Sequence, residues 1–247
     1  MNVVVASSRG FGLKEHLPQG TVLKCIPGGK LKTLTPLAKS LTPYAYKFRT
    51  RPHIYFLCGV PNISELIKSP DNDTYEYREV IFVEDTTTVI DRYQRELESA
   101  QREIIKHGAL PIFATIPQFN IEIYNNHLLT RDERGTSYLH QSSDYKIMQD
   151  NLMTTIDQLN TFIYNLNRKV EASTPFLHDT IKECRGRKGA RYYICKWNRL
   201  DDGLHAGDAL KKKWANVLEN CFRLNQEREE PKEGSSPKRL WKKCRIF

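Results

Sequence analysis

The sequence predicts one three-layer α/β domain in which helices cover both faces of a five-stranded, mostly parallel sheet. Short continuous apolar runs alternate along the chain with longer stretches whose apolar residues recur every three or four positions. Continuous apolar runs are typical of strands that are buried on both faces, and the longer pattern indicates amphipathic helices. Strands that alternate with helices in this way favour a parallel sheet.

The strands are expected where an apolar run ends at a turn sequence. The five predicted sheet strands are residues 2–6, 21–26, 53–58, 110–116 and 192–197, and residues 76–83 are a candidate edge strand. The predicted helices are residues 31–41, 90–104, 152–170 and 208–224. Residues 124–143, which are rich in Asn, Arg, Thr and Ser, are interpreted as an excursion from the domain.

The helix predicted at residues 152–170 has the clearest apolar pattern in the chain. Its apolar residues are spaced alternately by four and three positions, and they are Leu152, Ile156, Leu159, Ile163, Leu166 and Val170. This stripe is expected to pack on the sheet of its own domain. The same spacing also suits a coiled-coil dimer, so an oligomer formed through this helix is the alternative.

Composition and charge suggest how the chain is organised. Residues 1–224 are predicted to form the domain, and residues 225–247, which are charged and contain Pro, Gly and Ser, a flexible basic tail. The net charge of +9 favours an anionic partner such as nucleic acid or a lipid surface. The last four residues, Cys244-Arg-Ile-Phe247, fit a prenylation signal only loosely, because arginine is unusual at its second position.

Several classes of protein are not expected from this sequence. No run of about 18 apolar residues is present, so no transmembrane helix is predicted. The N-terminal residues lack the basic start and the long apolar stretch of a signal peptide. The six cysteines form no Cys-x-x-Cys pair, which disfavours a zinc site. The sequence therefore predicts an intracellular protein, cytoplasmic or nuclear, that uses no metal or other cofactor.

Polar residues and glycines follow the predicted strands at the points where the strands end. Ser7 and Ser8 follow the first strand, Gly28 and Gly29 the second, Asn62 the third, and Asp202 and His205 the last. Ligands bind outside the carboxyl ends of the strands in such sheets, so these residues are expected at one site. An aspartate three residues before a histidine can hold one imidazole nitrogen and leave the other free as a base. A helix-capping role for this aspartate is the alternative.

These stretches resemble the conserved blocks of the SGNH, or GDSL-type, hydrolases. Asp202-Gly-Leu-His205 before a helix resembles the last block, in which Asp and His complete a triad. Ala6-Ser7-Ser8 stands where the family has Gly-Asp-Ser, and Gly12 falls four residues beyond Ser8 as the family pattern requires. Gly28-Gly29 matches the glycine of the second block, and Gly59-Val-Pro-Asn62 resembles the third, Gly-x-Asn-Asp. The resemblance covers residues 2 to about 222 and implies a flavodoxin-like SGNH fold.

The resemblance also implies a serine esterase or deacylase that hydrolyses a small acyl ester. Ser8 is implied as the nucleophile, His205 as the general base and Asp202 as the group that stabilises the imidazolium. The amides of Ser8 and Gly29, together with the Asn62 side chain, are implied to hold the oxyanion.

Two departures from the family pattern weaken the predicted catalysis. Ser7 replaces the aspartate of the first block, and Pro61 takes the asparagine position of the third, which moves Asn62 one residue further. A catalytically weakened SGNH fold that binds nucleic acid or a protein is therefore the alternative. A flavodoxin-like nucleotide binder is a third hypothesis, but Arg9-Gly-Phe-Gly12 supplies only part of its phosphate loop.

A basic cluster precedes the last predicted strand. Residues 182–199 carry seven Lys and Arg residues and one acidic residue. The candidate nucleic-acid-binding residues are Arg185, Arg187, Lys188 and Arg191, because clustered basic residues with nearby aromatics can contact phosphates and bases. A solvated basic face is the alternative. SGNH-like domains also occur in the first-open-reading-frame proteins of some retrotransposons, a setting that this basicity suits.

Overall fold

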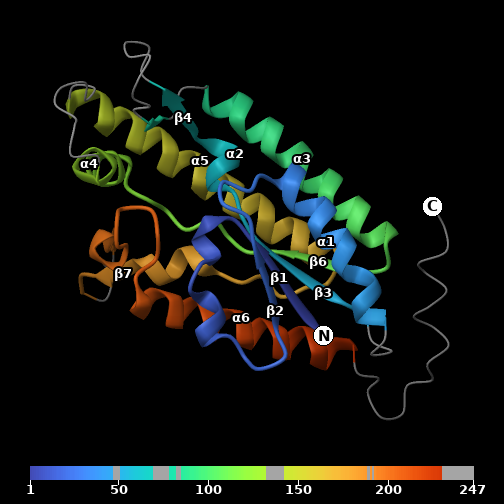
Figure 1. The fold of residues 1–247 in the computed structure, drawn as a ribbon. Coiled ribbons are helices and arrows are strands. Elements are labelled where there is room, and N and C mark those ends of the chain that lie inside the picture. Colours follow the sequence, from blue (N-terminus) through green and yellow to red (C-terminus); the bar gives the residue numbers. More distant parts are fainter. Residues whose placement is uncertain are drawn as a thin grey trace.

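The computed structural model describes residues 1–46, 51–68, 78–81, 85–131, 142–187, 190 and 192–229. Within these ranges the chain forms three layers, with a sheet between two layers of helices (Figure 1). Lys188, Arg191 and residues 230–247, which include Cys244, lie outside the described residues. Of the helices in the described ranges, none has the length and apolar content needed to cross a membrane.

The central sheet has four strands in the order β2-β1-β3-β6. Each neighbouring pair is parallel, and Val4 of the central strand lies beside Leu23 on one side and Tyr55 on the other. The strands are β1 (Asn2–Ala6), β2 (Val22–Cys25), β3 (His53–Leu57) and β6 (Leu110–Phe113). All five residues of β3 are buried, as expected for a parallel strand that helices cover on both faces.

Four long helices cover the sheet. They are α1 (Leu31–Tyr46), α3 (Thr86–Lys106), α5 (Ser142–Lys169) and α6 (Asp208–Glu229). Helices α1, α3 and α5 lie on one side of the strands and α6 on the other (Figure 1). Tyr55 meets the Phe222 ring of α6 at a centroid distance of 4.5 Å, whereas the next residue, Phe56, stacks on Phe113. Successive side chains of β3 therefore point to opposite faces of the sheet.

The apolar stripe of α5 is buried inside its own domain. Leu152, Ile156 and Leu159 have no exposed surface, and Ile163 and Leu166 are 1% exposed. These side chains belong to the core that includes the sheet. The stripe is therefore not open to a second helix.

The predicted fifth sheet strand is wrong. Residues Tyr192–Cys195 form β8, which pairs antiparallel with β7 (Lys182–Arg185) as a separate hairpin. The candidate edge strand does exist in part, since β5 (Arg78–Ile81) pairs with β4 (Glu65–Lys68), but that pair is also separate from the central sheet.

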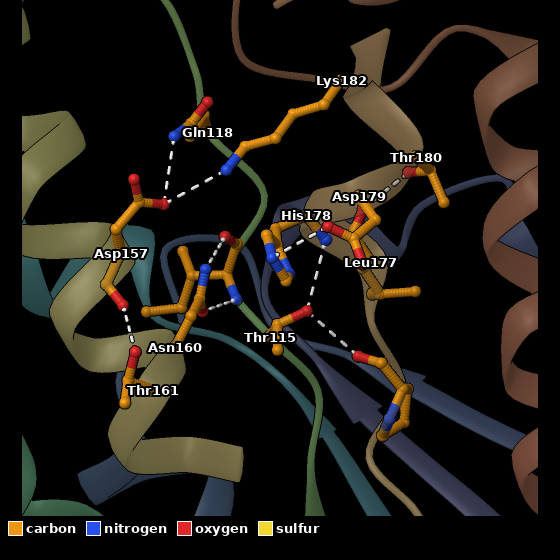
Figure 2. A network of polar contacts seen from close by, with 12 residues as sticks. Thr115, Gln118, Asp157, Asn160, Thr161, Leu177, His178, Asp179, Thr180 and Lys182 are labelled. Carbon is orange, nitrogen blue, oxygen red and sulfur yellow. Dashed lines mark hydrogen bonds and ion pairs between the residues drawn. The ribbon is translucent and has the colours of Figure 1, made fainter. Parts of the chain in front are cut away.

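Two asparagines of α5 bind backbone groups of β6 and of the segment that follows it, and Asn167 lies at the edge of β6 where a fifth strand would pair. Asn167 accepts a hydrogen bond from Phe113 N at 3.0 Å and donates one to Phe113 O at 2.7 Å. Asn160 makes the same two bonds with Ile116, at 2.6 and 3.0 Å (Figure 2). Because these side chains satisfy buried backbone groups that a neighbouring strand would otherwise satisfy, the sheet can end at β6.

The four predicted helices are all longer than predicted, α5 by ten residues at its start, and a further helix was not predicted. Helix α4 (Ile121–Arg131) lies in the first part of the predicted excursion. Helix α6 ends at Glu229, five residues beyond the predicted end and inside the stretch that was interpreted as a tail. Its added turn is held by Asn225, which is 2% exposed and donates to the Tyr55 hydroxyl at 3.1 Å. The residue that anchors this turn is polar, so the apolar pattern does not predict helix beyond Leu224.

We expect the α5 asparagines to contribute strongly to stability. Asn160→Ala or Asn167→Ala leaves one buried N–H and one buried C=O without partners, so the free energy of unfolding should fall by about 2–4 kcal/mol in each. Asn165→Ala is the matched control, because Asn165 is exposed on the same helix and should change stability by less than about 0.5 kcal/mol. Urea unfolding measures all three, and equal effects would contradict the proposed edge role.

Candidate active site

Ser8 lies immediately beyond β1, at the carboxyl edge of the sheet. Ser7 N donates to Leu57 O at 3.1 Å, which extends the pairing of β1 with β3 by one residue. The chain then forms a 3-10 turn over Ser8–Gly10. A Cβ on Gly10 would lie 2.4 Å from the Ala6 Cβ, so glycine is needed for the turn to fold back over the strand end. This turn holds the Ser8 hydroxyl above the sheet edge.

Asp202 and His205 lie on a loop that closes on itself before α6. Leu200 and Ala206 form an isolated antiparallel bridge, and Asp201 N donates to His205 O at 2.8 Å. Gly203 has φ +84, and a Cβ there would lie 2.7 Å from Tyr124 N. Glycine therefore allows the loop both its left-handed turn and its close packing on α4.

The side chains of Ser8, His205 and Asp202 form one hydrogen-bonded series. His205 Nε2 is 3.2 Å from Ser8 Oγ, and His205 Nδ1 is 2.6 Å from Asp202 Oδ2. The structure thus brings together three residues that are separated by up to 197 positions in the sequence. The His205 side chain is 33% exposed and that of Asp202 14% exposed, so the serine end of the series is open to a ligand while the carboxylate end is covered.

The surroundings of Asp202 favour its ionised form. Burial raises the pKa of this carboxyl, but hydrogen bonds from the His205 ring and from the backbone N–H groups of His205 and Leu204 outweigh burial. The pKa of Asp202 therefore lies well below its ordinary value. The two backbone bonds end on Oδ1, at 2.6 and 2.9 Å, which leaves Oδ2 for the imidazole. An ionised Asp202 then fixes the Nδ1–H tautomer and leaves Nε2 to accept a proton.

Arg9 links the Ser8 turn to the loop that carries Asp202 and His205. It was not predicted as a site residue. Its side chain is 6% exposed and donates to three backbone oxygens: Leu204 O at 3.0 Å, Pro117 O at 2.7 Å and Gln118 O at 3.4 Å. Burial lowers the pKa of Arg9 to about 9, and the nearby Asp202 carboxylate opposes that shift. Arg9 is therefore charged at neutral pH. Its position directly after Ser8 is the feature of the sequence that could have marked Arg9 as part of the site.

The two other predicted oxyanion donors have partners elsewhere. Gly29 N donates to Ile26 O at 2.9 Å within the turn after β2. The Asn62 side chain is 5% exposed; its Nδ2 donates to Glu96 Oε2 at 2.5 Å, and its Oδ1 accepts from Leu31 N at 3.4 Å. Their oxyanion role stays a prediction.

Tyr124 of α4 borders the imidazole of the series. Its ring lies edge-to-face with that of His205, at a centroid distance of 6.2 Å. Within the described ranges, no three His, Cys, Asp or Glu side chains gather closely enough to hold a metal ion. The hydrogen-bonded series itself offers a serine hydroxyl, an imidazole and a carboxylate for chemistry.

No protein-family model and no curated protein sequence matches the chain, but solved structures share its fold. A protein from Bacteroides fragilis described as an acylhydrolase aligns with 92% of this chain over 86% of its own, with 12% identity and a TM-score of 0.53. A GDSL-like lipase from Bacteroides thetaiotaomicron aligns with 92% of this chain over 87% of its own, with 10% identity and a TM-score of 0.53. The chain has the fold of the GDSL-type hydrolases. At such low identity the likeness concerns the SGNH fold alone.

We expect Arg9 to stabilise the SGNH fold through its three carbonyl partners. Arg9→Met removes hydrogen bonds from a charged group and leaves buried carbonyl oxygens without donors, so the free energy of unfolding should fall by about 3 kcal/mol or more. Arg223→Met is the control, because Arg223 is exposed and pairs with Glu227 in the next helical turn. Urea unfolding compares the two, and similar small losses would show that Arg9 does not hold these segments together.

We expect Asp202 to contribute to the acid sensitivity of the fold. Its pKa is lower in the folded chain than the ordinary value of 3.8, so its stabilising effect is complete above that pH and is lost as the pH falls further. Asp202→Asn should therefore lose less stability than the wild type between pH 7 and pH 3 in urea unfolding. Asp201→Asn, at the exposed neighbouring position, is the control. Parallel pH profiles for wild type and Asp202→Asn would contradict this assignment.

Proposed function

We propose that this chain is a serine hydrolase that cleaves a small acyl ester. The observation that carries the proposal is the hydrogen-bonded series Ser8–His205–Asp202, in which the nucleophile, its base and the group that orients the base are in contact. A nucleophile, a base and an orienting carboxylate in this arrangement are the requirements for acyl transfer through serine. The SGNH fold supports the proposal as an analogy only.

In the first half-reaction, Ser8 Oγ attacks the carbonyl carbon of the ester. His205 Nε2 accepts the hydroxyl proton as the new C–O bond forms, and Asp202 stabilises the resulting imidazolium. The tetrahedral intermediate then collapses, and the bond to the alcohol oxygen breaks. His205 returns the proton to that oxygen, so the alcohol leaves neutral and an acyl group remains on Ser8.

In the second half-reaction, water takes the place of the alcohol. His205 removes a proton from the water molecule, whose oxygen attacks the acyl carbon. Collapse of the second intermediate breaks the bond to Ser8, and the proton passes from His205 back to Ser8 Oγ. The products are a carboxylic acid and the unchanged enzyme.

The oxyanion formed in both steps needs hydrogen-bond donors. Ser8 is the first residue of its 3-10 turn, so its own N–H has no acceptor within that turn and is available beside Oγ. Gly29 N–H would have to leave Ile26 O, and Asn62 would use its second amide hydrogen or release Glu96. Because one missing donor costs about 10²–10³ in rate, we propose a slow esterase.

The test is turnover of p-nitrophenyl acetate by purified wild type, Ser8→Ala, His205→Ala and the double variant. We expect each single variant to lose about 10³-fold or more in kcat, and the double variant to lose no more than either single variant, because the residues act as one unit. Ser40→Ala is the matched serine control, since Ser40 is exposed on α1.

A fluorophosphonate reagent gives an independent readout in the same samples. Mass spectrometry should find the label on the peptide that contains Ser8 in wild type and Ser40→Ala, and not in Ser8→Ala. Equal turnover in all variants, with no label on Ser8, would refute the proposed reaction. A lower rate with p-nitrophenyl octanoate than with the acetate supports the preference for a small acyl group.

A further inference from the structure

The β7–β8 hairpin carries two tyrosines that the domain does not cover. Tyr192 is 56% exposed and Tyr193 is 68% exposed, although both lie within a four-residue strand. Arg185 and Arg187 are exposed at the end of the partner strand. From this combination of bare aromatic rings and positive charge, we propose that the hairpin binds single-stranded nucleic acid. The proposal is independent of the reaction at Ser8.

The base of the hairpin is fixed to the domain. Lys182 and Gln118 both contact Asp157 Oδ1 of α5, each at 3.3 Å, as Figure 2 shows. Cys195, at the other side of the hairpin base, donates its thiol hydrogen to Gln118 Oε1 at 2.6 Å. Lys182 and Cys195 are themselves paired across the two strands. The strands therefore extend from a rigid base, and the tyrosines are presented on a preformed element.

The register places the tyrosines on opposite faces of the hairpin. Tyr192 is paired with Arg185 and Tyr193 with Cys184. Residues that are directly opposite in an antiparallel pair share a face, so one face carries Tyr192 beside the Arg185 guanidinium and the other carries Tyr193. A strand of nucleic acid that wraps around the hairpin can therefore stack bases on both rings while its phosphates meet the arginine side chains.

The charges on the hairpin favour an anionic partner. Residues 182–199 include seven basic residues and one acidic residue, Glu183. Glu183 is already engaged by Lys196 at 2.8 Å and by Arg185 at 3.3 Å. Hydrogen bonds from these two partners lower the pKa of Glu183, so it stays ionised and balances part of the charge, but a large positive excess remains. An acidic protein surface would only neutralise the positive charges. A nucleic acid would neutralise them with its phosphates and would also stack its bases on the exposed tyrosine rings.

The tyrosines distinguish single strands from duplex. In a duplex the faces of the bases are stacked on one another, and only their edges and the phosphates are accessible. Stacking on Tyr192 and Tyr193 therefore requires unpaired bases. Phosphate binding by Arg185 and Arg187 adds affinity that depends on salt but not on base sequence.

Base stacking on the tyrosines and phosphate binding by the arginines can be separated by measuring the affinity as a function of salt concentration. Fluorescence anisotropy of a labelled oligothymidylate with the full chain gives Kd at several KCl concentrations. Tyr192→Ala/Tyr193→Ala should raise Kd at least about tenfold and leave the slope of log Kd against log[KCl] unchanged, because stacking releases no counterions. Arg185→Gln/Arg187→Gln should lower that slope by about 0.7 for each phosphate that the variant no longer neutralises.

Two controls and a competitor complete the test. Tyr164→Ala removes a 43% exposed tyrosine from α5 and should bind like the wild type. Ser8→Ala should also bind normally, so failure of the esterase proposal does not affect this one. The proposal is overturned if duplex binds as tightly as single strand, if the tyrosine variant keeps its affinity, or if polyglutamate displaces the oligonucleotide at equal charge concentration. The last outcome would indicate an acidic protein partner instead.

Discussion

The buried guanidinium of Arg9 holds together the three chain segments on which the candidate site depends. It follows Ser8 directly, and it binds carbonyl oxygens of residues 117 and 118 after β6 and of residue 204 beside His205. A buried charge is costly unless it is hydrogen-bonded, so the convergence of these segments on Arg9 favours the folded arrangement. The separation of Ser8 and His205 is thus set largely through backbone groups and not through the triad alone.

The end of the sheet at β6 has consequences beyond the core. Asn167 takes the hydrogen-bonding role of a fifth strand at Phe113, Asn160 binds the backbone just beyond β6, and both lie on a helix whose apolar stripe packs in the same core. The last strand-like segment of the chain is therefore free to pair with β7 outside the sheet. The same arrangement that completes the core leaves Tyr192 and Tyr193 exposed on a hairpin.

The candidate active site is more complete on its base side than on its oxyanion side. Asp202 receives two backbone N–H bonds in addition to the imidazole, so the charged form that orients His205 is well stabilised. Opposite the nucleophile, Gly29 and Asn62 are engaged in bonds that shape the turn after β2 and the contact between α2 (Val60–Ile63) and α3. The proposed esterase would therefore activate serine well, and its rate would be limited by stabilisation of the intermediate.

Local patterns in the sequence determined the fold class, four of the five predicted sheet strands, the place of Ser8 after the first strand and that of Asp202 and His205 on a loop before the last helix. These features depend on apolar periodicity and on short motifs, which can be recognised without knowing the neighbours of a residue. Only the tertiary structure decided that residues 192–195 leave the sheet, because their apolar run suits a buried strand and a hairpin equally well. It also decided the partners of Arg9, Asn160 and Asn62, because a polar side chain acquires its role from backbone groups that are distant in the sequence.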